Sequence, residues 1–411
     1  MKKTLWMLGV AVAALTSCTQ SEVVDIPESR IIQFDTFVGK STRAAIPINQ
    51  YQDNNQYDTE TPPKSNLYQF WVFGTQSDMN VLKFDGTDEK AKVYFHKANN
   101  TFLYDNHLTW KFGETYNFAA YSNGNKPLVE NAEYDTPVTT PPAAVTFEDL
   151  IADNVIYGSK LFFDDYTVGD MDLLAAITTT TTLPQNASSV SSVPLYFEHM
   201  LALVNIRLEN NTEDLHMQID DMTFNAITKD DCSYMINVAN TNATKETRTI
   251  VWENMNSQYG DNNANDRVTN GTYEFMGTAK GIQMSNNLST SPDDYLAPGQ
   301  ALELTYFVIP QNNQNIKDIT LTTQSYHRTE TDNGNGGQIY TYELSNNTGQ
   351  VKTHKVSLAV PNQGHTSWQP GYRYSYTGSL SGNAHFIHFE VKSVTDWSAN
   401  NTEVNGSVVT E

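Results

Sequence analysis

Leu203-Val204-Asn205-Ile206-Arg207-Leu208 and Leu302-Glu303-Leu304-Thr305-Tyr306-Phe307-Val308 are the stretches that decide the fold class. In both, apolar and polar side chains alternate, which is the period of a β-strand with one buried face. Similar runs occur at residues 68–73, 116–121 and 386–391, and Asn-Gly turn signals separate several strand candidates. The sequence therefore predicts an all-β protein built of β-sandwiches, with one helical turn expected at residues 147–152.

The amino terminus has the pattern of an export signal. Lys2 and Lys3 precede an apolar run, residues 5–15, that is shorter than the roughly 20 residues of a membrane-spanning helix. Leu15-Thr16-Ser17-Cys18 follows and resembles a lipobox, in which the cysteine is acylated and becomes the first mature residue. Residues 1–17 are thus predicted to be a lipoprotein signal peptide, with lipid on Cys18 anchoring the chain in an outer membrane. The alternative is an ordinary signal peptide cut near a chance cysteine.

Composition narrows the classes of partner. The formal net charge is −22, and such a surface repels nucleic acid, so no nucleic-acid partner is expected. After Cys18, Cys232 is the one cysteine left, so no intramolecular disulfide can form. Because Asp230 and Asp231 precede Cys232 and would raise its thiol pKa, we interpret this cysteine as a small filler and not as a nucleophile.

The chain divides into regions at polar, turn-forming segments. Residues 18–43 form a polar leader that contains a strand-like run at 31–38, in which Ile32, Phe34, Thr36 and Val38 share one face. A first domain is predicted at residues 44–210 and a second at 211–411. The boundary is placed within the polar segment 209–214, which has strand patterns on both sides.

Several motifs occur in a common order along nearly the whole chain. In that order the sequence resembles the fimbrillin-like (Mfa-like) pilins of the Bacteroidales, a branch of the type V pilus proteins. The motifs are Ile32-Gln33-Phe34, Lys40-Ser41-Thr42-Arg43-Ala44, Leu67-Tyr68-Gln69-Phe70-Trp71-Val72-Phe73, Thr109-Trp110, Asp172-Leu173-Leu174-Ala175, Phe197-Glu198-His199-Met200-Leu201-Ala202, Phe307-Val308-Ile309-Pro310-Gln311, Trp368-Gln369-Pro370-Gly371-Tyr372 and Val394-Thr395-Asp396-Trp397.

The resemblance implies a fold and a route of assembly. The fold would be two tandem transthyretin-like β-sandwich domains. The subunit would cross the envelope as a lipoprotein and be cut between Arg43 and Ala44 by a protease specific for Arg or Lys. The removable first strand, with Ile32, Phe34, Thr36 and Val38 facing inward, would leave a groove that a strand of another pilin subunit fills. Such a subunit would belong to a cell-surface fimbrium with a role in adhesion, and its partners would be pilin subunits and a host or bacterial surface ligand.

The residues themselves offer the parts that strand exchange needs. Loss of a strand uncovers unpaired main-chain groups, which favour pairing with another chain. For the donor, the tail at residues 398–411 places Val404, Gly406 and Val408 on one face. The alternative is an inert tail, in which case the subunit would suit a tip or terminal position better than a repeating stalk.

Motifs for metal binding or catalysis are weak. His385 and His388 are three apart in a strand pattern and would point to opposite faces. The stretch 261–266 resembles a calcium loop but lacks the glycine at the sixth position and the glutamate at the twelfth. His199 has no partner nucleophile in the pattern and is interpreted as a structural histidine. We therefore expect no enzyme, no catalytic residues, no metal site and no cofactor.

A second class of function fits the same leader. A lipid-anchored surface glycan-binding protein of a polysaccharide-uptake system would also be exported through Cys18. The two hypotheses differ at Arg43, because a binding lipoprotein keeps its anchor and a polymerising subunit loses it.

Overall fold

The protein is almost entirely built of β-strands. Among the described residues the other regular elements are two short 3₁₀ turns, Glu253–Met255 and Pro292–Asp294, so the predicted all-β fold is confirmed. In this part of the chain no helix is both long and apolar enough to span a membrane. The computed structural model describes residues 31–38, 69–76, 81–85, 92–96, 101–104, 107–122, 144–152, 155–169, 172–178, 181–182, 191–237, 247–255, 269–273, 291–312, 315–316, 318–345, 351–358, 367–381 and 387–396.

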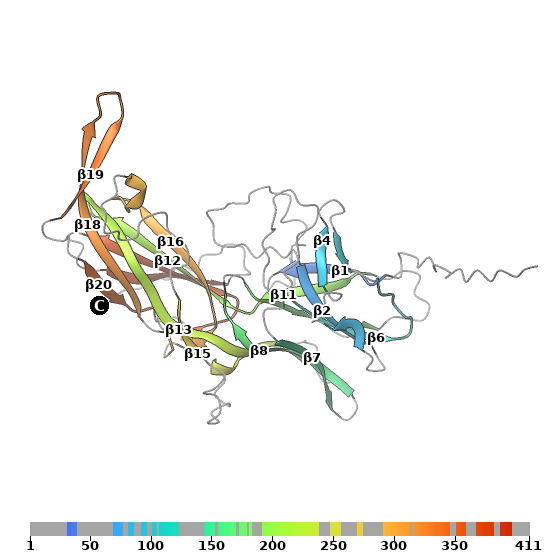
Figure 1. Ribbon diagram of the computed structural model, residues 1–411. Helices are drawn as coiled ribbons and strands as arrows, with labels where there is room; N and C mark the ends of the chain where they lie inside the picture. The colour runs from blue at the N-terminus through green and yellow to red at the C-terminus, as the bar shows by residue number, and fades with distance from the viewer. Residues whose placement is uncertain are drawn as a thin grey trace, which may run out of the picture.

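The first lobe is built on a nine-stranded sheet that contains the start of the described chain (Figure 1). Its main order is β1-β11-β9-β6-β2-β4-β5, with β3 paired to β2 and β10 paired to β6. The strands are β1 (Phe34–Val38), β2 (Gln69–Gln76), β3 (Val81–Asp85), β4 (Lys92–His96), β5 (Thr101–Tyr104), β6 (Thr115–Ser122), β9 (Leu174–Ile177), β10 (Thr181–Thr182) and β11 (Val193–His199).

The two ends of this sheet meet at the residues that precede β1. The main-chain N–H of Ile32 donates to the oxygen of Leu108 at 2.8 Å, and Ile31 forms an antiparallel bridge with Thr109. Residues 108 and 109 follow β5, whereas β1 pairs with β11 at the opposite end of the order. The segment 31–38 therefore pairs with β11 on one edge and contacts the residues after β5 on the other, over an apolar core.

The second lobe is a sandwich of a four-stranded and an eight-stranded sheet. The order is β16-β12-β22-β23 in the first and β19-β18-β13-β8-β7 in the second, where β14 and β15 also pair with β13 and β20 pairs with β18. A short pair, β17–β21, completes the lobe. The bounds are β7 (Ala144–Ala152), β8 (Val155–Thr167), β12 (Ala202–Asn211), β13 (Leu215–Asn237), β14 (Thr247–Trp252), β15 (Thr269–Tyr273), β16 (Ala301–Val308), β17 (Gln311–Asn312), β18 (Ile319–Asp332), β19 (Gln338–Leu344), β20 (Lys352–Val356), β21 (Ser367–Trp368), β22 (Tyr372–Ser381) and β23 (Ile387–Asp396).

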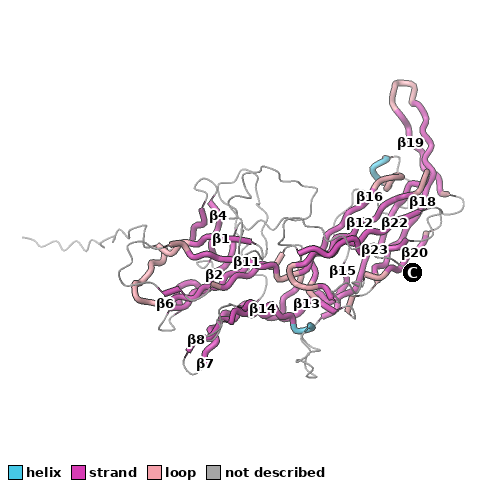
Figure 2. The backbone as a smooth tube through the Cα atoms, turned by 180° about the vertical axis from the view of Figure 1, so that it is seen from behind, coloured by secondary structure: helices cyan, strands magenta, loops and turns pink. Residues whose placement is uncertain are grey.

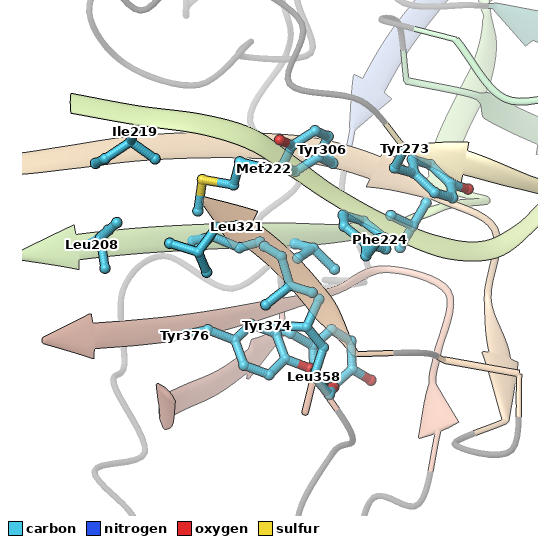
Figure 3. Packing of buried hydrophobic residues seen from close by; sticks show 14 of the residues in the cluster. Leu208, Ile219, Met222, Phe224, Tyr273, Tyr306, Leu321, Leu358, Tyr374 and Tyr376 are labelled. Carbon is cyan, nitrogen blue, oxygen red and sulfur yellow. Dashed lines mark hydrogen bonds between the residues drawn. The ribbon is translucent and has the colours of Figure 1, made fainter. Parts of the chain in front are cut away.

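One core lies between these two sheets. The inward residues of β12 alternate with outward ones, as the sequence pattern predicts, and meet side chains from β13 and β18. Figure 3 shows aromatic rings from several strands converging in this core, among them Phe224, Tyr273, Tyr306 and Tyr374. The Phe224 and Tyr273 rings stack with centroids 4.8 Å apart.

Strand β13 is 23 residues long and connects the lobes. Its first half pairs with β18 and its last residues pair with β8 and β14. The tube view from behind (Figure 2) shows this continuous strand running from the sandwich toward the β7–β8 hairpin. The last residues of β13 also pack in a core with side chains of β2 and β6, so the lobes are held together by side-chain packing.

A further core forms between the lobes, on the outer face of the first sheet. Strand β6 is buried on both sides: Tyr116 and Phe118 face the interior of the first lobe, and Ala119 and Tyr121 face this junction core. Trp71 of β2 stacks on Tyr121 with ring centroids 5.3 Å apart. The two faces of this sheet therefore pack in two different hydrophobic cores.

One sequence expectation is wrong, and a second stays untested. Residues 147–152 are not a helical turn, because they lie in β7 and pair with β8 throughout. Within the predicted boundary segment 209–214, Asn210 and Thr212 are buried, and the Asn210 amide donates to the main-chain oxygens of Leu215 and Leu296 at 2.8 Å each. Strand β12, which ends there, belongs to the four-stranded sheet of the second lobe. The boundary itself stays a prediction.

Candidate functional site

The candidate site is the groove that β1 occupies. β1 runs parallel to β11 in a register from Phe34↔Val193 to Val38↔Phe197. The N–H of Val193 donates to the oxygen of Gln33 at 2.7 Å. Together with the bond from Ile32 to Leu108, these contacts hold the segment on both of its edges.

The inward face of this segment is completely covered. Ile32, Phe34 and Thr36 are 0%, 4% and 3% exposed, whereas Gln33 and Asp35 between them are exposed. The alternation buries the three side chains in the core of the first lobe. Val38 ends β1, and its side chain lies outside the described residues.

Phe34 sits in an aromatic pocket. Its ring centroid lies 6.2 Å from Phe70, 6.0 Å from Tyr104 and 5.6 Å from Phe118, in each case edge to face. Such contacts add about 0.5–1.5 kcal/mol per pair beyond the burial of area. The pocket is therefore shaped for a ring at this position of the strand.

Tyr104 also binds the main chain of the segment. Its hydroxyl donates to the oxygen of Ile32 at 2.7 Å and accepts from the N–H of Leu108 at 3.2 Å. Burial raises the pKa of Tyr104 to about 12, so the hydroxyl remains a donor at neutral pH. This contact accepts any residue at position 32, because it uses only the carbonyl oxygen.

Thr36 differs from its two inward neighbours. Its hydroxyl oxygen is buried and has no hydrogen-bond partner among the described residues. A buried hydroxyl without a partner costs about 1–3 kcal/mol. The third inward position therefore buries a small side chain whose hydroxyl gains no hydrogen bond among the described residues.

Several sequence-predicted residues lie outside the described residues. These are the lipidation site Cys18, the processing pair Arg43 and Ala44, the tail residues Val404, Gly406 and Val408, the histidine His385 and the stretch 261–266. His388 lies in β23, but its side chain is not among those described. Their roles stay predictions.

His199 is a buried residue at the end of β11, as expected for a structural histidine. Its Nδ1 lies 2.6 Å from Oδ2 of Asp172, which is also buried and lies two residues before the start of β9. Burial raises the pKa of Asp172, and the neighbouring imidazole opposes that effect. The pair thus connects two of the sequence motifs, residues 172–175 and 197–202.

Cys232 and its acidic neighbours are buried beside β8. Cys232 is buried, and its pKa is raised well above its usual value, first by burial and then by Asp230 and Asp231, as the sequence interpretation expects for the two acids. The carboxylates of Asp164, Asp165 and Asp231 lie within 4.8 Å of one another. The N–H of Asp165 donates to Asp231 at 2.6 Å, and Lys229 lies 3.0 Å from Asp165, so this cluster is bound within the protein itself.

Asp149 was not singled out by the sequence. From β7 it accepts hydrogen bonds from Thr75 of β2, Asn117 of β6 and Ser159 of β8, at 3.0, 3.2 and 2.9 Å. It therefore fastens the β7–β8 hairpin to the outer face of the first sheet. No local pattern marks this residue, because its donors come from three distant segments.

The motifs of the second half have structural roles. Gln311 is buried, accepts from the N–H of Ile227 at 2.9 Å and donates to the oxygen of Ile309 at 2.9 Å. The indole of Trp368 donates to the Tyr376 hydroxyl at 2.9 Å, and that hydroxyl donates to the oxygen of Leu358 at 2.8 Å. These bonds fix β17, β21 and β22 around the sandwich core.

The fold and the groove define a structural, all-β protein whose first strand completes both a sheet and a core. A family model described as fimbrillin-like matches residues 59–397, and the chain belongs to this family of fimbrial cell-surface proteins. The resemblance in the sequence is thereby confirmed. The family is structural and not enzymatic.

The solved structures that the chain matches include fimbrial proteins of Bacteroidales bacteria. One is a fimbrial protein from Bacteroides vulgatus (14% identity, TM-score 0.36, covering 90% of this chain and 99% of that one). Another is the fimbrial anchor protein Mfa2 from Porphyromonas gingivalis (7% identity, TM-score 0.27, covering 92% of this chain and 100% of that one). A third is a fimbrial assembly protein from Parabacteroides distasonis (10% identity, TM-score 0.30, covering 89% of this chain and 98% of that one). No curated protein matches the chain.

Proposed function

We propose that this chain is a structural or tip subunit of a surface fimbria that assembles by β-strand exchange and contributes to adhesion. It is exported as a lipoprotein, held at the outer membrane through Cys18, and cut between Arg43 and Ala44. β1 then leaves its groove, and a strand of another pilin subunit takes its place. The two lobes correspond to two tandem transthyretin-like sandwich domains.

The observation that supports this proposal is the double role of β1. With the two residues before it, the strand supplies Ile32 and Phe34 to the core of the first lobe and buries Thr36, and the segment pairs with β11 on one edge and with residues 108–109 on the other. The predicted cut at Arg43 follows this strand directly in the sequence. A cut there would turn a covalent part of the fold into an exchangeable one.

An empty groove would be unstable enough to require a new strand. Burying one large apolar side chain contributes about 1.5–3 kcal/mol, so loss of Ile32 and Phe34 together costs about 3–6 kcal/mol. The main-chain groups of β11 would also lose their partners along β1. A strand from another subunit restores both contributions by β-augmentation.

Amino-terminal sequencing of surface-sheared polymer tests the proposal. We expect material that starts at Ala44. In an Arg43→Ala variant, the chain should stay lipidated at Cys18 and should not enter polymers. An Arg30→Ala variant, altered at a basic residue before β1, serves as the matched control and should still start at Ala44.

The same experiment separates the glycan-binding alternative. Sheared or membrane-bound material that always retains a blocked Cys18, with no polymer in any strain, would contradict fimbrial assembly. It would leave a tethered surface protein, for which binding to polysaccharides can then be measured directly.

A further inference from the structure

We infer that the groove of the first lobe selects a strand with an aliphatic, an aromatic and a small side chain at alternate positions, and that it takes this strand from a different subunit and not from the tail of a second copy. The inference rests on the proposed strand exchange and names the partner of that same groove. It follows from the three pockets that Ile32, Phe34 and Thr36 occupy.

The three pockets make different demands. At position 32 the side chain is fully buried, so an aliphatic residue fits. The Tyr104 hydroxyl contacts only the main-chain oxygen there, so it does not distinguish one aliphatic residue from another. At position 34 the rings of Phe70, Tyr104 and Phe118 surround the side chain, with centroids at 5.6–6.2 Å. The middle position is therefore the one that demands a particular type of residue.

The third pocket tolerates a small side chain without offering it a hydrogen bond. Thr36 is 3% exposed, and its hydroxyl oxygen has no partner among the described residues. Valine has nearly the same volume and no hydroxyl, so it fits this position at least as well. The complete pattern is aliphatic-x-aromatic-x-small, in a strand parallel to β11 if it reuses the bonds of β1.

The tail of this chain fails at the middle position. In the register that places Val404 and Val408 in the first and third pockets, Gly406 falls in the aromatic pocket. No residue from 398 to 411 is aromatic, so a shift of register does not correct the mismatch. Truncating a buried Phe costs about 3–5 kcal/mol, which corresponds to about 100-fold or more in affinity.

The test uses the mature chain with a specific protease site in place of residues 39–43, cut after folding so that the native structure forms first. Synthetic peptides are then added in excess. Native mass spectrometry measures the fraction of protein molecules that carry the resident segment and the fraction that carry the added peptide. The peptides are residues 29–38, the same peptide with Phe34→Gly, the tail 398–411, and the tail with Gly406→Phe.

We expect the 29–38 peptide to replace the resident segment and its Phe34→Gly variant to bind about 100-fold or more weakly. The tail should not bind, whereas its Gly406→Phe variant, which completes the pattern with one residue, should bind within about 10-fold of the 29–38 peptide. Equal binding of the tail and its Gly406→Phe variant would overturn the selectivity while leaving strand exchange intact. A 29–38 peptide that never replaces the resident segment would instead refute strand exchange itself.

Discussion

The hydroxyl of Tyr104 donates a 2.7 Å hydrogen bond to the main-chain oxygen of Ile32, although 72 positions separate the two residues. The bond fastens the start of the first-strand segment to the end of β5, at the place where the sheet closes. Because it contacts the strand through the main chain, Tyr104 would hold a resident and an incoming strand alike.

Replacement of Tyr104 by Phe should loosen this closure. The hydroxyl makes two hydrogen bonds, to the oxygen of Ile32 and from the N–H of Leu108, and each contributes about 0.5–1.5 kcal/mol, so we expect the free energy of unfolding in urea to fall by about 1–3 kcal/mol. Tyr306→Phe is the matched control, because the Tyr306 hydroxyl is buried and has no hydrogen-bond partner among the described residues. That control should be neutral or stabilising, and an equal loss in both variants would contradict the role of the Tyr104 bond.

Replacement of Thr36 by Val should stabilise the protein. The change removes a buried hydroxyl without a partner and keeps the shape of the side chain, for an expected gain of about 1 kcal/mol in urea denaturation. Thr178→Val provides the contrast, because the Thr178 hydroxyl accepts from the N–H of Phe118 at 3.1 Å and donates to its oxygen at 3.2 Å. Thr178→Val should destabilise the protein, and the idea fails if both variants change stability in the same direction.

Asp230 should make stability depend on pH. Burial raises its pKa from 3.8 to about 6, against the opposing effect of hydrogen bonds from Asn254. A pKa raised in the folded state contributes stability that is complete below about pH 4 and is lost as the pH rises through 6.

The wild type should therefore lose up to about 3 kcal/mol relative to Asp230→Asn between pH 4 and pH 7, measured by urea denaturation at each pH. Asp293→Asn removes an exposed acid and serves as the control for the loss of one negative charge alone. A flat difference for Asp230→Asn would refute the raised pKa.

Removal of Asp149 should free the β7–β8 hairpin. Asp149→Ala breaks three hydrogen bonds to a carboxylate that come from β2, β6 and β8, and we expect a loss of about 3 kcal/mol in the free energy of unfolding. Hydrogen exchange should also speed up at the amides of β7. Glu148→Ala is the control. Glu148 is exposed and forms a surface ion pair with Lys160 at 3.6 Å, so its removal should change the free energy of unfolding by less than about 0.5 kcal/mol. Similar exchange rates in the two variants would argue against this role.

Strand alternation made much of the fold predictable. The runs at 203–208 and 302–308 appear as β12 and β16, paired with each other from Ala202↔Val308 to Glu209↔Ala301. Residues 147–152 were misjudged because Phe147, Leu150 and Ile151 have the spacing of a helical face, whereas pairing with β8 decides their conformation. The local spacing of apolar residues does not reveal which distant strand a segment pairs with.

The candidate site was only partly predictable for the same reason. The alternation of Ile32, Phe34 and Thr36 identifies an inward face, and the structure buries these three side chains together. The residues that form the pockets, Phe70, Tyr104 and Phe118, come from separate strands, and nothing in their spacing connects them to β1. The pockets therefore form only when the fold brings these separate strands together.

The continuous strand β13 couples two cores through one backbone. Its first half contributes Leu215, Met217 and Ile219 to the core of the sandwich, and its last residues contribute Cys232, Tyr234 and Ile236 to the core between the lobes. Because no turn interrupts the strand, a displacement of its first half is carried to its far end through the main chain. The two cores should therefore unfold as one cooperative unit and not in separate steps.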